Sequence, residues 1–147
     1  MAEAYVRGSL QRMGVASVQA ASAGFFCNGE PASAAAQAVM AKEGCSLKNF
    51  RSSVLTRERV REAERVVCMT RSHRNAVLAL APDCAERVGC LLPDGDVPDP
   101  YGGDEASYRR VFEFMRPALD ALVRELADGE TGKQTVNSPK NNQGESV

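Results

Sequence analysis

The chain has 147 residues, of which 44% are hydrophobic and 25% charged, and its formal net charge is −1. These values are typical of one globular domain, and the near balance of charge argues against a nucleic-acid partner or a membrane surface held by a basic face. No apolar run approaches the ~20 residues of a spanning helix, and no signal core follows the N-terminus, so we expect a cytoplasmic protein.

Five cysteines and a single histidine are present. The cysteines are Cys27, Cys45, Cys68, Cys84 and Cys90. Because their number is odd and no Cys-x-x-Cys pair occurs, they indicate neither a disulfide scaffold nor a zinc site. We expect reduced thiols, no metal and no cofactor.

Hydrophobic periodicity and capping residues predict helices that alternate with strands. In chain order we expect a helix over 2–13, a strand over 15–22, helices over 31–43 and 56–63, a strand over 66–69, a helix over 70–80, a strand over 88–92 and a helix over 104–126. Pro31 stands at the first position of its helix, and Thr56 and Asp104 can cap theirs, as can either Thr70 or Ser72.

This alternation predicts an α/β fold, a three-layer sandwich with a short parallel sheet and helices on both faces. The helical pattern of the last element stops at Gly129. We therefore expect a folded domain over residues 1–128 and a disordered polar tail over 129–147, because the tail has too few aliphatic side chains to offset the entropy of ordering.

The sequence Pro98-Asp99-Pro100-Tyr101 stands after the strand over 88–92, and two glycines follow it. Each proline restricts the backbone around Asp99, and a stiff loop can hold a proton donor still. The carboxyl end of a parallel strand is where open α/β sheets place ligands. Asp99 is therefore a candidate acid with Tyr101 as its wall, and the alternative is an ordinary turn with a solvated carboxylate.

Four short motifs, in this order, resemble the low-molecular-weight protein tyrosine phosphatase family over about Met1 to Leu126. They are Met1-Ala2-Glu3-Ala4, Ser22-Ala23-Gly24, Val67-Cys68-Met69 and Asp99-Pro100-Tyr101-Gly102-Gly103. The resemblance implies hydrolysis of phosphate esters on a phosphorylated protein or peptide, through a cysteinyl-phosphate. It also implies that Asp99 is the catalytic general acid and base, and that Tyr101 lines the substrate cleft.

The chain differs from the family pattern at its beginning. In the family, a strand and a phosphate-binding loop, Cys, five residues, Arg, Ser or Thr, immediately precede the motif that here starts at Met1. We therefore expect a fold without its first strand and an inactive polypeptide, and we hypothesise that Met1 is an internal methionine of a longer protein. The uncapped first amides of the helix over 2–13 face the substrate phosphate in the family, a use that suits a helix N-terminus.

One string inside the chain matches Cys, five residues, Arg, and runs from Cys45 to Arg51. It follows a helix rather than a strand, holds no glycine, and leads into no helix that would present its amides to a phosphate. Coincidence is the favoured interpretation. Cys68 is expected to be a small core residue, Cys27 an exposed and oxidisable thiol, and His73 a surface or packing residue.

Three alternatives stay open. Gly102 stands where many family members have a second aromatic residue, and some bacterial members with Gly-Gly here act on phosphoarginine, so an arginine phosphatase is one alternative. The others are a pseudophosphatase that binds phosphoprotein without turnover, and an arsenate reductase, which shares the scaffold but needs shuttle cysteines.

Overall fold

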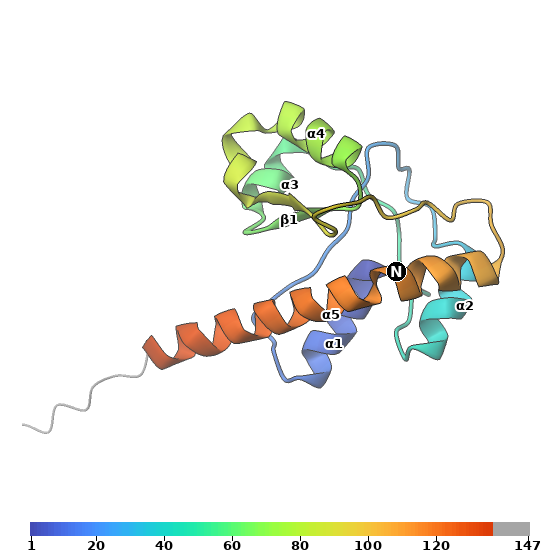
Figure 1. Ribbon diagram of the computed structural model, residues 1–147, viewed down its shortest axis with the longest axis horizontal. Helices are drawn as coiled ribbons and strands as arrows, with labels where there is room; N and C mark the ends of the chain where they lie inside the picture. Colours follow the sequence, from blue (N-terminus) through green and yellow to red (C-terminus); the bar gives the residue numbers. More distant parts are fainter. Residues whose placement is uncertain (137–147) are drawn as a thin grey trace, which may run out of the picture.

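The structure, a computed structural model, describes residues 1–136. Its elements are α1 (Ala2–Arg12), α2 (Ala34–Lys42), α3 (Arg57–Glu62), β1 (Val66–Cys68), α4 (Arg71–Leu80), the 3-10 helix η1 (Pro82–Arg87), β2 (Val88–Cys90) and α5 (Glu105–Val136). The two strands lie between α3 and α4 on one side and α1, α2 and α5 on the other (Figure 1). The prediction of a three-layer α/β fold with a short parallel sheet is confirmed.

The strands β1 and β2 pair in parallel, and α4 and η1 form the crossover between them. The register sets Val66 opposite Val88, Val67 opposite Gly89, and Cys68 opposite Cys90. Successive side chains of a strand point to opposite faces. Accordingly Val67 packs against the hydrophobic cluster of α1, α2 and α5, while Cys68 belongs to the cluster of α3 and α4.

The predicted strand over 15–22 is wrong, because these residues form irregular chain. Val15, Val18 and Ala20 are partly buried against the core, so the content of Val and Ala that favoured a strand has a structural basis. A strand, however, needs a neighbour to exchange backbone hydrogen bonds. Among the described residues no ladder forms with this segment, and only Gly24, just beyond it, makes an isolated parallel bridge with Val54.

Most helix starts follow their predicted caps. The Thr56 hydroxyl accepts a hydrogen bond from the N–H of Arg59, and the Thr70 hydroxyl accepts one from the N–H of His73, which selects Thr70 over Ser72. The predicted start of α2 at Pro31 is wrong by three residues. Its cap is Ser33, whose hydroxyl accepts from the N–H of Ala36, because a side-chain acceptor outweighs the preference of proline for a first turn.

The long helix α5 begins as predicted, with Asp104 accepting a hydrogen bond from the N–H of Ser107 over 2.8 Å. Its predicted end at Leu126, ahead of Gly129, is wrong, since the helix continues to Val136. A single glycine costs a helix only about 1 kcal/mol, which does not suffice to end it. The predicted disorder from Gly129 onward thus does not describe residues 129–136, and residues 137–147 lie outside the described part of the chain.

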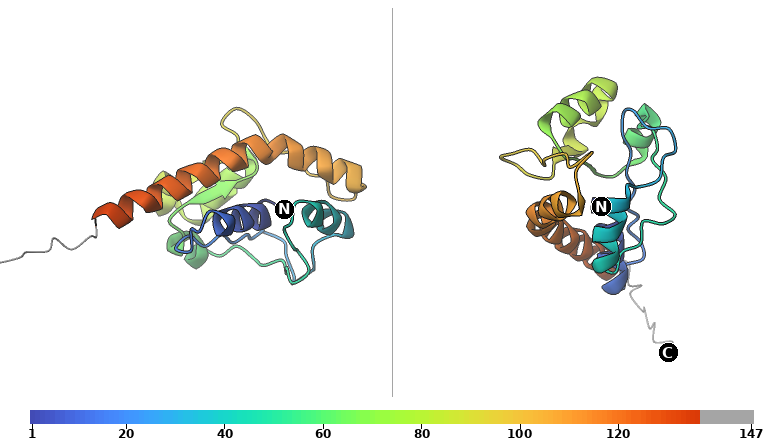
Figure 2. Two further views of the ribbon diagram at one scale, coloured as in Figure 1. Left: turned by 90° about the horizontal axis from the view of Figure 1, so that it is seen from below. Right: turned by 90° about the vertical axis from the view of Figure 1, so that its right-hand side faces the viewer.

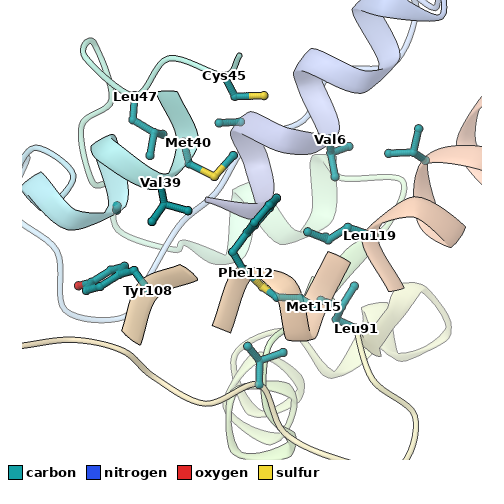
Figure 3. Packing of buried hydrophobic residues seen from close by; sticks show 14 of the residues in the cluster. Val6, Val39, Met40, Cys45, Leu47, Leu91, Tyr108, Phe112, Met115 and Leu119 are labelled. Carbon is teal, nitrogen blue, oxygen red and sulfur yellow. The ribbon is translucent and has the colours of Figure 1, made fainter. Parts of the chain in front are cut away.

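The larger hydrophobic cluster is centred on Phe112 of α5, whose side chain is 0% exposed. Its ring meets that of Tyr5 edge-on, with centroids 5.3 Å apart. Figure 3 shows Phe112 between Val6 of α1 and Met40 of α2, so this ring joins three helices in one layer. The views in Figure 2 show α5 lying along α1 and α2, which agrees with this packing.

Candidate active site

The loop from Leu91 to Asp104, here called the acid loop, joins β2 to α5 and carries the predicted site residues. Oδ1 of Asp99 accepts a hydrogen bond from the backbone N–H of Tyr101 over 3.0 Å. The N–H of Gly103 donates to the carbonyl of Pro100 over 2.8 Å, and Gly102 has φ +79°, a value that L side chains rarely adopt. The loop is therefore a tight turn that holds the carboxylate of Asp99 from its own backbone.

Three hydrogen bonds anchor the acid loop to the end of β1 and the start of α4. The N–H of Leu91 donates to the carbonyl of Cys68 over 2.8 Å, and the N–H of Val97 donates to the carbonyl of Met69 over 2.9 Å. Oδ1 of Asp96 accepts from the N–H of Arg71 over 2.8 Å. Sequence reasoning missed Asp96, because it caps a helix 25 residues before it and no local pattern marks such a cap.

A shallow hollow of about 360 Å³ opens beside the carboxylate of Asp99. Its lining combines apolar and charged side chains from the acid loop and the first turns of α5, namely Pro98, Asp99, Pro100, Ser107, Arg110, Val111 and Phe114. The Tyr101 side chain is 87% exposed and is not among these residues. The structure thus brings Asp99 and Tyr101 together through the backbone of one turn, with the ring projecting into solvent.

The N-terminal turn of α1 has no side-chain cap, as expected. Glu3 in this turn accepts a hydrogen bond from the hydroxyl of Ser22 over 2.5 Å and pairs with Arg7 over 2.9 Å. Burial lowers the pKa of the Met1 amine, and the negative charge of Glu3 acts in the opposite direction. Two of the motifs that carry the family resemblance, at Met1 and at Ser22, are therefore in direct contact through Glu3.

The string from Cys45 to Arg51 does not form a phosphate-binding loop. Cys45 is only 4% exposed and packs in the core between α1 and α2 (Figure 3), where its thiol donates to the carbonyl of Glu43 over 3.6 Å. A Cβ on Gly8 of α1 would lie 3.0 Å from its sulfur. Arg51 is exposed and donates to the carbonyl of Phe50 over 2.7 Å. The interpretation of this match as coincidence is confirmed.

The remaining candidates also have structural roles. Cys68 is buried, as expected of a small core residue, and burial raises the pKa of its thiol. Cys27 is half-buried beside Gly24 rather than exposed. His73 is exposed, as expected of a surface residue, and its ring centroid lies 6.4 Å from that of Phe25.

None of the five cysteines lines the hollow beside Asp99. Among the described residues, no three His, Cys, Asp or Glu side chains gather as a metal site would require. Within residues 1–136, no helix is both long and apolar enough to cross a bilayer.

Two relatives named protein-arginine-phosphatase resemble this chain in sequence. The one from Geobacillus stearothermophilus is 30% identical over 115 residues, which cover 74% of this chain and 77% of the relative. The one from Bacillus subtilis (strain 168) is 32% identical over 134 residues, covering 86% of this chain and 85% of the relative.

Solved structures agree with the sequence comparison. A low molecular weight protein tyrosine phosphatase from T. tengcongensis superposes with a TM-score of 0.78 at 30% identity, over 84% of this chain and 88% of that chain. An arginine phosphatase with a cysteine-to-serine substitution and a phosphorylated active-site serine superposes with a TM-score of 0.79 at 27% identity, over 86% of each chain.

The model of the family described as "Low molecular weight phosphotyrosine protein phosphatase" matches residues 1–132. That match spans most of the chain, and the two relatives and both solved structures are named as protein phosphatases of arginine or tyrosine. The chain therefore belongs to the low molecular weight phosphotyrosine protein phosphatase family.

Proposed function

We propose that this domain removes phosphoryl groups from protein side chains, with Asp99 as general acid and base and Tyr101 as a wall of the substrate cleft. The observation that carries the proposal is the placement of Asp99, an exposed carboxylate on a turn anchored at the carboxyl ends of both strands. Such anchoring keeps the carboxylate in place without burying it. A proton donor needs this combination, because it must be positioned and must also reach a leaving group.

The reaction would proceed in two steps. A thiolate attacks phosphorus and forms a cysteinyl-phosphate, the bond to the leaving group breaks, and Asp99 in its acid form protonates that group. As a carboxylate, Asp99 then takes a proton from the water that hydrolyses the intermediate. The phosphorylated active-site serine in the substituted arginine phosphatase supports this path, since a phosphoryl group rests there on a substituted side chain.

We further propose that the 147-residue polypeptide does not catalyse this reaction by itself. The first step needs a thiolate that can attack the phosphoryl group while Asp99 protonates the leaving group. None of the cysteines lines the hollow beside Asp99. Cys45, which matches the signature as a string, is buried and does not line this hollow, and its thiol donates to the carbonyl of Glu43.

Phosphoarginine is the substrate that we propose first, and phosphotyrosine second. Two relatives that cover most of this chain are named arginine phosphatases. Gly102, at φ +79°, follows Tyr101, so no second aromatic side chain comes directly after Tyr101 in this turn. The tyrosine phosphatase from T. tengcongensis, at 30% identity, supports the second substrate.

Five free thiols fit a reducing compartment, and we propose that the protein acts in the cytoplasm.

The first test uses the polypeptide of residues 1–147 with p-nitrophenyl phosphate, a phosphoarginyl peptide and a phosphotyrosyl peptide. We expect no phosphate release above the rate in buffer. Release that Cys45→Ser abolishes would contradict the proposed inertness and return the nucleophile to Cys45. Tight binding of either phosphopeptide without release would instead support a second function, recognition of phosphoprotein by a pseudophosphatase.

The second test supplies a nucleophile. A chimera carries the strand and the Cys-to-Arg loop of the Bacillus subtilis relative immediately before Met1. We expect activity to appear, and Asp99→Asn to lower kcat by about 10²–10⁴-fold, the range of general acid catalysis, while Asp94→Asn on the same loop leaves it unchanged. Equal rates for Asp99→Asn and its control would exclude Asp99 as the acid. The ratio of kcat/KM for the two phosphopeptides decides the substrate independently of that result.

A further inference from the structure

We propose that Cys68 and Cys90 are a redox-active pair, which hydrogen peroxide converts into a disulfide that joins the ends of β1 and β2. This inference does not depend on the proposed phosphatase function. In the structure both thiols are free.

The register of the sheet places the two cysteines opposite each other. Adjacent strands lie about 4.7–4.9 Å apart, and disulfides join residues whose Cα atoms are about 4.4–6.8 Å apart, so the backbone is already within bridging range. Residues opposite each other in a ladder point to the same face of the sheet. Both side chains accordingly contact one hydrophobic cluster, that of α3, α4 and η1.

The two thiols differ in access to solvent. Cys68 is 5% exposed, and its pKa is raised, first by burial and then by the neighbouring Cys90, while Arg74 acts in the opposite direction. Cys90 is half-buried. Since a small oxidant must reach the sulfur that it oxidises, Cys90 is the residue that reacts first and Cys68 is the resolving thiol.

Oxidation of the two thiols to a disulfide proceeds in two steps. The Cys90 thiolate attacks one peroxide oxygen, the O–O bond breaks, and the released hydroxide takes a proton to become water, which leaves a sulfenic acid on Cys90. The Cys68 sulfur then attacks the Cys90 sulfur, the S–O bond breaks, and the hydroxide leaves as water with the thiol proton. Two thiols lose two electrons in total, and one peroxide becomes two waters.

The other cysteines lack such a partner opposite them. Cys84 is buried in the same cluster but lies in η1, outside the ladder. Cys45 belongs to the other cluster, on the far face of the sheet, and Cys27 contacts Gly24 in a loop. Membership of the same hydrophobic cluster therefore does not by itself predict a disulfide. The pairing of Cys68 with Cys90 in the register of the two strands does.

The bond would form where the acid loop is anchored. Cys90 directly precedes Leu91, whose N–H donates to the carbonyl of Cys68, and Met69 accepts from the N–H of Val97. A covalent link at this point would restrain the first residues of the acid loop. Slower hydrogen exchange at the amides of Leu91 and Val97 is the expected physical consequence.

The test treats the native, fully reduced chain with one equivalent of hydrogen peroxide, blocks free thiols by alkylation, and digests with trypsin. Cleavage after Lys and Arg leaves the five cysteines on five separate peptides. These are residues 13–42 with Cys27, 43–48 with Cys45, 66–71 with Cys68, 75–87 with Cys84 and 88–109 with Cys90. Before alkylation, we expect the intact mass to fall by two hydrogen atoms. After digestion, we expect peptides 66–71 and 88–109 to be the dominant linked pair, which dithiothreitol separates.

Variants make the result specific. Cys84→Ala should leave the linked pair unchanged, whereas Cys90→Ser should keep the mass of the reduced protein at this dose. In Cys68→Ala the sulfenic acid on Cys90 has no partner, so dimedone should capture it on peptide 88–109. Linkage of any other two peptides, or sulfinic acid on Cys90 while Cys68 stays reduced in the unmutated chain, would overturn the proposal.

Discussion

Oδ1 of Asp96 accepts a hydrogen bond from the backbone N–H of Arg71 across 2.8 Å, so the acid loop caps α4 from outside that helix. Thr70, the residue directly before this helix, also caps it, because its hydroxyl accepts a hydrogen bond from the N–H of His73. The first amides of a helix have no intrahelical partner. Here two of these amides find hydrogen-bond acceptors on two segments that are far apart in the sequence. The position of the Asp99 turn and the start of α4 are therefore coupled.

This coupling predicts that Asp96→Ala destabilises the fold by about 1 kcal/mol, the usual cost of losing a helix cap. Urea denaturation followed by circular dichroism measures it. Asp94→Ala is the matched control, because Asp94 is an exposed acid on the same loop and its replacement should change the free energy of unfolding by less than about 0.5 kcal/mol. Equal effects of the two substitutions would show that the Asp96 bond contributes nothing in solution.

Gly103 closes the Asp99 turn, and a side chain there has no room. A Cβ at this position would lie 2.9 Å from the carbonyl oxygen of Pro100 and 2.9 Å from Cβ of Ser107. Gly103→Ala should therefore cost about 1–3 kcal/mol through overpacking. Gly95→Ala, on the same loop, meets nothing within 4 Å and should be nearly neutral. Thermal denaturation of both variants decides, and a stable Gly103→Ala protein would mean that the turn opens at no cost.

Two phenylalanines on α5 predict opposite outcomes. Phe112 is fully buried and its ring lies beneath the guanidinium of Arg116, 4.7 Å from the ring centroid, so Phe112→Ala should cost about 3–5 kcal/mol. Phe114 is 53% exposed, and Phe114→Ala should cost less than about 1 kcal/mol. Urea midpoints compare the two. A similar midpoint for both variants would contradict the placement of α5 against α1 and α2.

The hydrogen bond from the hydroxyl of Tyr5 to Asp120, over 2.5 Å, predicts a pH dependence. This bond is the main reason why the pKa of Tyr5 is raised above its ordinary value, with burial second. Because the folded state favours the neutral phenol, the stabilisation is complete below the unfolded pKa of about 10 and is lost as pH rises through the higher folded value.

Tyr5→Phe should therefore lower the free energy of unfolding by about 1 kcal/mol at pH 7, and by progressively less above pH ~10. Chemical denaturation between neutral and alkaline pH gives both numbers. Tyr101→Phe, which changes an exposed ring, should leave the free energy of unfolding unchanged across this pH range. A constant difference between Tyr5→Phe and the unmutated chain across this range would show that the Tyr5 hydroxyl is not held by Asp120.

Local sequence predicted those features whose cause lies within a few residues. Thr56 and Asp104 cap the helices that follow them, and the apolar run from Val66 forms a strand because it can be covered on both faces. The strand over 15–22 failed for the complementary reason. The segment has the Val content of a strand, but a strand exists only with a neighbour, and the described residues place none beside it.

The candidate site divides in the same way. Asp99 stands between two prolines, so its place on a stiff turn could be predicted from the sequence, and so could its position after β2. The anchor at Asp96 and the hollow shared with Arg110 and Phe114 could not, because both join residues of separate elements.

The alternation of helices and strands from Thr56 onward, the caps at Thr56 and Asp104 and the turn at Asp99 were determined by the sequence alone, since each depends on backbone preferences and on neighbours along the chain. Only the tertiary structure decided that the thiol of Cys45 is buried against Gly8, and that Cys68 faces Cys90. The same string of residues can form a phosphate loop or a core contact. Burial and register decide between them, and both arise from contacts between segments that are distant in sequence.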